Sequence, residues 1–240
     1  MTTGESLIAH LIELRSRLMH AVIALLVVFL CLFPWAADLY ALLAQPMLSK
    51  LPKGGQMIAT GVTTPFFVPL KVAMMTAFLI SLPYIMWQVW RFVAPGLYLH
   101  EKRLVLPLVV ASTLLFFSGM MFAYFAVFPV VFGFITAAAP QGVAVMTDID
   151  QYLSFVIGMF MAFGITFEVP VAVVVLVHMG VVTVEKLREI RSYVIVGAFV
   201  VGAIFTPPDV VSQFMLAIPL WLLYEAGIVV ASWMKKPVEN

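Results

Sequence analysis

Long apolar stretches without charged residues run through this chain, and they alternate with short segments that carry most of the charge. A helix needs about 20 apolar residues to cross a bilayer, and it satisfies its own backbone hydrogen bonds there. The pattern therefore predicts six membrane-spanning helices, at about residues 18–37, 68–90, 104–128, 153–179, 192–206 and 210–233.

Two of these predicted helices have distinctive ends. No charge occurs from Leu104 to Thr147, which is too long for one helix, so we expect the third helix to end near Phe128-Pro129. A re-entrant or interfacial connection should follow it. The fifth helix is short for a full crossing, and Pro207-Pro208 ends it because proline lacks a backbone donor. The largest outer loop is expected at residues 38–65.

Composition places the chain among membrane proteins. Of its 240 residues 64% are hydrophobic and 10% are charged, with a mean hydropathy of +1.11, whereas soluble domains carry about 25% charged residues. The predicted fold class is all-α, a polytopic membrane protein with a single transmembrane domain over residues 1–240. The net charge of +1 and the lack of a basic run give no indication of nucleic-acid binding.

The basic residues predict the orientation. Ten of the 13 Lys and Arg residues fall on one side of the membrane when the six helices alternate in direction, and cytoplasmic loops carry such an excess. Both termini are therefore expected in the cytoplasm. The ten residues are Arg15, Arg17, Arg91, Lys102, Arg103, Lys186, Arg188, Arg191, Lys235 and Lys236.

An amphipathic helix is predicted at residues 6–18, before the first span. Leucines recur on one face, and Glu13 and Arg17 lie on the other. Because these two residues are four apart, one interpretation is a local ion pair that stabilises the helix by a few tenths of a kcal/mol. The other is that Glu13 binds a ligand.

Glu101 precedes the third predicted helix, on the same side as Glu13. It could be a solvated acid that balances Lys102 and Arg103. Alternatively, two carboxylates on an otherwise basic rim could each take a guanidinium in bidentate geometry, which lysine cannot mimic. A ligand with paired arginines would suit such a site.

Glu168 lies about midway along the fourth predicted helix. A charge at that depth costs about 2.5–3.5 kcal/mol on insertion scales, so such a residue is a functional candidate. Pro170 favours a bend beside it. The alternative is a protonated or paired structural carboxyl. Gln213 and Thr206 are plausible polar partners from the last two helices.

The other reactive residue types do not form a site. Cys31 is the single cysteine and lies in an apolar run, and the four histidines are scattered, so no metal site is expected. The sequence contains no nucleophile elbow, zinc-protease motif or phosphate-binding glycine loop. We expect neither an enzyme nor a cofactor.

Four segments together resemble the TatC family, the receptor subunit of the twin-arginine protein translocase, and the resemblance covers nearly the whole chain. They are His10-Leu-Ile-Glu-Leu-Arg15, Phe92-x-x-Pro-Gly-Leu-Tyr-x-x-Glu101, Phe163-Gly-x-x-Phe-Glu-x-Pro170 and Thr206-Pro-Pro-Asp-x-x-Ser-Gln213.

The resemblance implies a cup-shaped bundle of six helices with short fifth and sixth helices, in the bacterial cytoplasmic membrane. It implies that twin-arginine signal peptides of folded cargo bind at the cytoplasmic face. TatA- and TatB-type single-span proteins would be partners, within a complex that holds several copies of the chain. The implied roles are signal-peptide binding for Glu13, Glu101, Arg15 and Phe92, partner docking inside the membrane for Glu168, Thr206 and Gln213, and assembly for Pro46 in the first outer loop.

A second function remains open from the residues themselves. A proton-coupled transporter of small solutes could use Glu168 as a proton relay. Paired carboxylates at one rim favour the receptor, because a relay does not need them.

Overall fold

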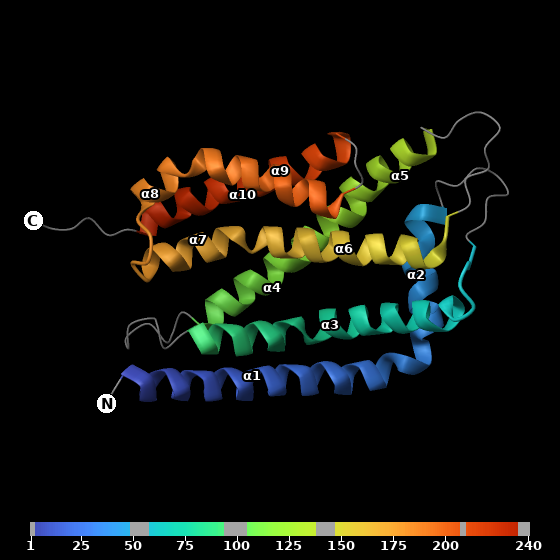
Figure 1. Cartoon of the computed structure of the whole chain (residues 1–240), viewed down its shortest axis with the longest axis horizontal. Helices are drawn as coiled ribbons and strands as arrows, with labels where there is room; N and C mark the ends of the chain where they lie inside the picture. Colours follow the sequence, from blue (N-terminus) through green and yellow to red (C-terminus); the bar gives the residue numbers. More distant parts are fainter. Residues whose placement is uncertain (1–2, 49–57, 94–104, 138–146, 207–209, 235–240) are drawn as a thin grey trace, which may run out of the picture. The chain divides into compact units, whose positions relative to one another are not determined.

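The computed structural model describes residues 3–48, 58–93, 105–137, 147–206 and 210–234, which are almost entirely helical (Figure 1). Within these described ranges, five helical stretches are long and apolar enough to cross a membrane, and α9 is a shorter apolar helix. The expected all-α, polytopic fold is confirmed. The elements are α1 (Thr3–Leu32), η1 (Phe33–Trp35), α2 (Ala36–Leu48), α3 (Thr64–Val93), α4 (Val105–Phe122), η4 (Ala123–Val127), α5 (Phe128–Ala137), α6 (Ile149–Phe167), α7 (Val169–His178), α8 (Val184–Glu189), α9 (Arg191–Phe205) and α10 (Val210–Met234).

The last two helices of the chain, α9 and α10, differ in length. α9 has 15 residues and is short, as the resemblance implied. α10 has 25 residues, which is long enough for a full crossing at 1.5 Å per residue. The expectation that the sixth helix is also short is therefore wrong.

Helical structure also extends past two predicted ends. Residues 38–48, expected in an outer loop, belong to α2. Pro34 interrupts α1 with a single 3₁₀ turn, and the Ala- and Leu-rich segment after it resumes the helix because these residues have high helix propensity. Residues 129–137 of the expected re-entrant connection belong to α5.

A π-helical turn explains why Pro129 does not end the third predicted helix. In η4 the Phe128 N–H donates to the carbonyl of Ala123, five residues back. Membrane helices accommodate proline by such local changes of hydrogen bonding. The helix therefore continues through Pro129.

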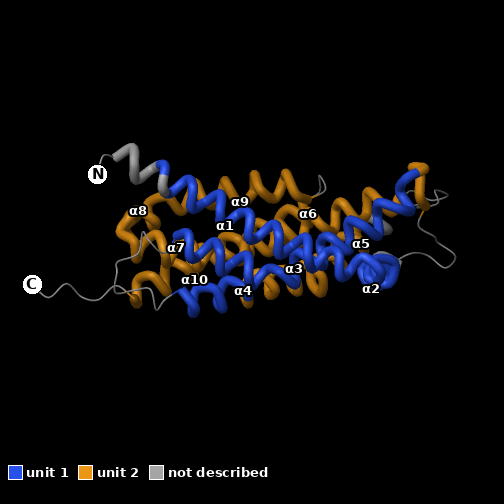
Figure 2. The backbone as a smooth tube through the Cα atoms, turned by 90° about the horizontal axis from the view of Figure 1, so that it is seen from below, with its two compact units in different colours: residues 1–43, 63–113 blue, residues 44–62, 114–240 orange. Residues whose placement is uncertain are grey.

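The helices form two compact units, coloured in Figure 2: residues 1–43 with 63–113 (unit 1) and residues 44–62 with 114–240 (unit 2). In unit 1, α1 runs along α3. Trp90 of α3 donates its indole N–H to the Ser112 hydroxyl of α4 at 3.0 Å, and both side chains are buried. Apolar residues of α1 such as Leu30 remain largely exposed, which suits contact with lipid.

In unit 2, α10 packs against α7 and α9. The Tyr224 hydroxyl of α10 donates to the Leu187 carbonyl of α8 at 2.8 Å, inside a buried apolar cluster. Beside it, Arg191 Nη2 donates to Glu225 Oε2 at 2.6 Å. This ion pair joins the start of α9 to α10.

Two glycines let α4 and α6 approach closely within unit 2. A Cβ at Gly119 would lie 2.5 Å from the Phe163 carbonyl oxygen, and one at Gly164 would overlap the Phe116 ring. Helices in membranes use small residues in this way because close packing drives their association.

Gly119→Ala is therefore expected to lower the thermal unfolding midpoint of the chain in detergent by a few degrees, since overpacking costs about 1–3 kcal/mol. Gly158→Ala in α6 is the matched control, because no described atom outside its own stretch of helix backbone lies within 4 Å of the added Cβ, and alanine favours helix. Equal midpoints for the two variants would contradict the close approach.

Candidate functional site

A polar groove of about 550 Å³ lies between α1 and α3 of unit 1. Residues three or four apart lie on one face of a helix, so each helix presents one polar face to the groove. Its lining consists of Ile12, Glu13, Ser16, Arg17 and His20 from α1 and Tyr84, Gln88 and Arg91 from α3.

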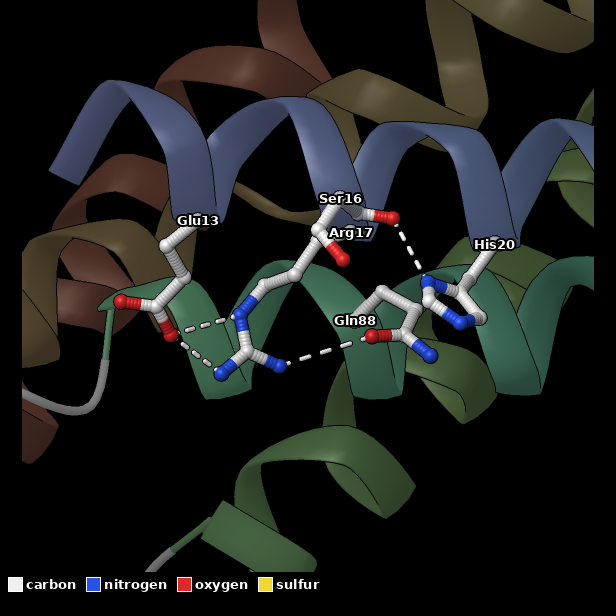
Figure 3. Close-up of polar contacts among 5 residues, drawn as sticks. All are labelled: Glu13, Ser16, Arg17, His20 and Gln88. Atoms are coloured by element: carbon white, nitrogen blue, oxygen red, sulfur yellow. Dashed lines mark hydrogen bonds and ion pairs between the residues drawn. The ribbon is translucent and has the colours of Figure 1, made fainter. Parts of the chain in front are cut away.

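The guanidinium of Arg17 lies between Glu13 and Gln88, two other residues of the groove lining (Figure 3). Its Nε donates to Glu13 Oε1 at 2.9 Å, and Nη2 bonds to the same oxygen. Nη1 lies 3.5 Å from Gln88 Oε1. The Arg17 side chain is 18% exposed and that of Glu13 is 34% exposed, so the pair is partly buried. The local ion pair, one of the two interpretations of Glu13, is thus present.

Of the other residues predicted for this site, Phe92 contacts α1 near Glu13. Phe92 stacks on His10 of α1, with ring centroids 4.2 Å apart and planes inclined by 20°. This contact places Phe92 one turn before Glu13 along α1. Arg15 is exposed and is not among the residues that line the groove. Glu101 lies outside the described residues.

The polar residues predicted near the last two helices bind the backbone of α9. The Thr206 hydroxyl donates to the Gly202 carbonyl at 2.7 Å, and Gln213 Nε2 donates to the Phe199 carbonyl at 2.9 Å. Gly202 makes room for Gln213, whose Cγ would lie 3.0 Å from an added Cβ.

Glu168 occupies the junction between α6 and α7, where the helix is interrupted next to Pro170. The interruption agrees with the bend expected there. One carboxylate oxygen of Glu168, Oε1, is buried. Pro46 belongs to α2 and not to an irregular outer loop.

The comparisons with known proteins decide the family. The family described as Sec-independent protein translocase protein (TatC) matches residues 9–219. A Sec-independent protein translocase protein TatC from Escherichia coli is 56% identical over 224 residues, which are 93% of this chain and 87% of the relative. This chain belongs to the TatC family. It is a component of a protein translocase and a multi-pass membrane protein.

A more distant relative and a solved structure agree with this assignment. The TatC protein of Aquifex aeolicus is 42% identical over 221 residues, 91% of each chain. A crystal structure described as the twin-arginine translocase receptor TatC superimposes with a TM-score of 0.83, at 41% identity, over 95% of this chain and 100% of that chain. The resemblance predicted from the four motifs is confirmed.

The contacts of two residues in this TatC-family chain are not predicted by the sequence patterns above. Gln88 is a polar residue inside a predicted apolar helix, near the same end of the helices as Glu13, and that position is the signal that could have found it. Asp148 precedes an apolar run, which is the pattern of a helix N-cap.

Asp148 joins the start of α6 to residues 58–60. Its Oδ1 accepts from the backbone N–H groups of Asp150 and Gln151, and its Oδ2 accepts from the Thr60 hydroxyl at 2.5 Å and the Thr60 N–H at 3.0 Å. The backbone of Ile58 pairs with Thr147 and Ile149 on either side. The Thr60 hydroxyl, followed by the backbone N–H donors, lowers the pKa of Asp148 to about 2.

Because its folded pKa is lowered, Asp148 should stabilise the fold above the usual carboxyl pKa of about 3.9 and lose this effect as the pH falls through about 2. Asp148→Asn should lower the unfolding midpoint at pH 7, and the difference from the original chain should shrink between pH 4 and pH 2. Asp150→Asn, which removes a carboxylate from the same helical turn, is the control. A pH-independent difference for Asp148→Asn would contradict the role of its charge.

Proposed function

We propose that this TatC-family chain binds twin-arginine signal peptides at the cytoplasmic face and recruits TatA- and TatB-type proteins to export folded cargo. Glu13, Glu101, Arg15 and Phe92 would form the peptide site, with both termini of the chain in the cytoplasm. The similarity to a structure described as a twin-arginine translocase receptor supports the proposal.

One observation carries the peptide-binding part. The Glu13 carboxylate already holds a guanidinium inside a partly buried groove, with the Gln88 amide oxygen as a further acceptor beside it. Charge-assisted bonds to arginine are stronger and more directional than those to lysine. The groove therefore has the chemistry that an arginine of a signal peptide requires.

Partner docking would involve Glu168, Thr206 and Gln213, with Pro46 in assembly. Side-chain bonds to backbone carbonyls hold Thr206 and Gln213 against α9, so polar groups occupy the α9–α10 hairpin without charge. A single-span partner could present a matching polar side chain there, because hydrogen bonds between membrane helices stabilise their association by about 0.6–2 kcal/mol.

The peptide site is tested by Glu13→Ala and Glu101→Ala. Each should weaken binding of a twin-arginine peptide by about ten- to a hundredfold in a fluorescence anisotropy titration of the chain in detergent, because a charge-assisted bond is lost. Glu189→Ala is the control, since it removes an exposed carboxylate that pairs with Lys186. Unchanged affinity in both test variants would refute the site.

Glu168 separates the receptor from the proton-coupled transporter. Glu168→Gln keeps hydrogen-bonding capacity without titration, whereas Glu168→Ala removes both. If the residue docks a partner, the Gln variant should retain substantial cargo export and partner crosslinking, and the Ala variant should lose much of both. A proton relay requires the two variants to be equally inactive. Equal loss of export with normal crosslinking would exclude docking as the role of Glu168.

A further inference from the structure

We propose that Arg17 is an internal placeholder for the signal peptide. In the free chain its guanidinium occupies the Glu13 carboxylate, and it must leave before an arginine of the peptide can bind there. The inference rests on the proposed function and adds a regulatory step to the same site.

The geometry of the Arg17–Glu13 pair supports the replacement of Arg17 by an arginine of the peptide. Nε and Nη2 of Arg17 both reach the same carboxylate oxygen, Oε1. A guanidinium that approaches a carboxylate freely forms two parallel bonds, one to each oxygen. Arg17 is tethered four residues away on the same helix and uses only one oxygen in this structure. An arginine from a separate chain does not have this restraint, so it can form the stronger arrangement.

The groove also offers the displaced guanidinium another acceptor. Gln88 projects from α3, its side chain is buried, and its Oε1 already lies 3.5 Å from Arg17 Nη1. A neutral amide is a weaker partner than a carboxylate, so Gln88 would not hold Arg17 in the absence of peptide. Gln88 would limit the loss of hydrogen-bond energy when Arg17 leaves Glu13.

The size of the effect follows from a population argument. When only a fraction of the chains has a vacant Glu13, the apparent dissociation constant is the intrinsic one divided by that fraction. Partly exposed ion pairs between residues four apart shift such an equilibrium by about two- to fivefold. Every peptide that uses Glu13 must displace Arg17, so the placeholder reduces all affinities equally and leaves their ratio unchanged.

Arg17→Gln is the test, measured as anisotropy of labelled Arg-Arg and Lys-Lys peptides on the full chain in detergent at constant ionic strength. Both peptides should bind about two- to fivefold more tightly, with an unchanged ratio of affinities. Arg17→Lys keeps the charge but makes a weaker contact, so it should fall between the original chain and Arg17→Gln, and it provides the test if Arg17→Gln does not fold. In a Glu13→Gln background, Arg17→Gln should produce no gain.

Arg91→Gln is the matched control, because Arg91 also lines the groove and its removal changes the local charge equally. A gain for Arg17→Gln that does not exceed the gain for Arg91→Gln would overturn the placeholder. So would weaker binding or an altered ratio, since either result would show that Arg17 itself contributes to recognition. If Glu13→Gln alone leaves peptide affinity unchanged, the proposed role of Glu13 in peptide binding fails, whatever Arg17 does.

Discussion

The hydrocarbon core of a membrane supplies no water to bond with backbone N–H and C=O groups, so a helix that crosses it must satisfy every one of them internally. This constraint accounts for the irregular points of the structure. At Pro129 a π turn carries the helix past the missing donor, and at Glu168 the Glu168 N–H bonds to the Ile165 carbonyl, three residues back, before α7 begins. Thr206 and Gln213 follow the same constraint, because the side chain of each donates a hydrogen bond to a backbone carbonyl of α9.

A charged side chain without a partner is even less favourable in a membrane than an unpaired backbone group. Two ion pairs lie near contacts between helices. Arg191 at the start of α9 bonds to Glu225 of α10. Arg17 bonds to Glu13 on the same helix, α1, in the groove between α1 and α3. The first pair joins two helices of unit 2 beside a buried apolar cluster. The second lies within one helix, in a polar groove lined by further charged and polar side chains. We infer different roles from these surroundings: the Arg191 pair fixes the hairpin, whereas the Glu13 carboxylate can exchange its partner.

The sequence predicted the elements well because the length of an apolar run directly reports a membrane crossing. It predicted the ends less well. Hydropathy cannot show that the helix continues beyond Asp38 or through Pro129, because helical structure does not stop where the membrane does and a π turn leaves no clear sequence signal. The Glu13–Arg17 pair follows from spacing along one helix. A polar residue in an apolar run marks Gln88 as a candidate, but its contact with Arg17 depends on how α3 packs against α1, and no local pattern encodes that register.

The proposed placeholder role of Arg17 also agrees with the energetics of a site that binds its ligand only part of the time. A partly buried carboxylate without a partner is costly, since desolvation penalises the charge and its lone pairs lack donors. A groove that binds arginine is therefore more stable with a resident donor while no peptide is bound. Arg17 holds the Glu13 carboxylate in position with the same functional group that a twin-arginine peptide would bring. Under the proposed function, peptide binding would replace one guanidinium by another, so the carboxylate would be unpaired only during the exchange.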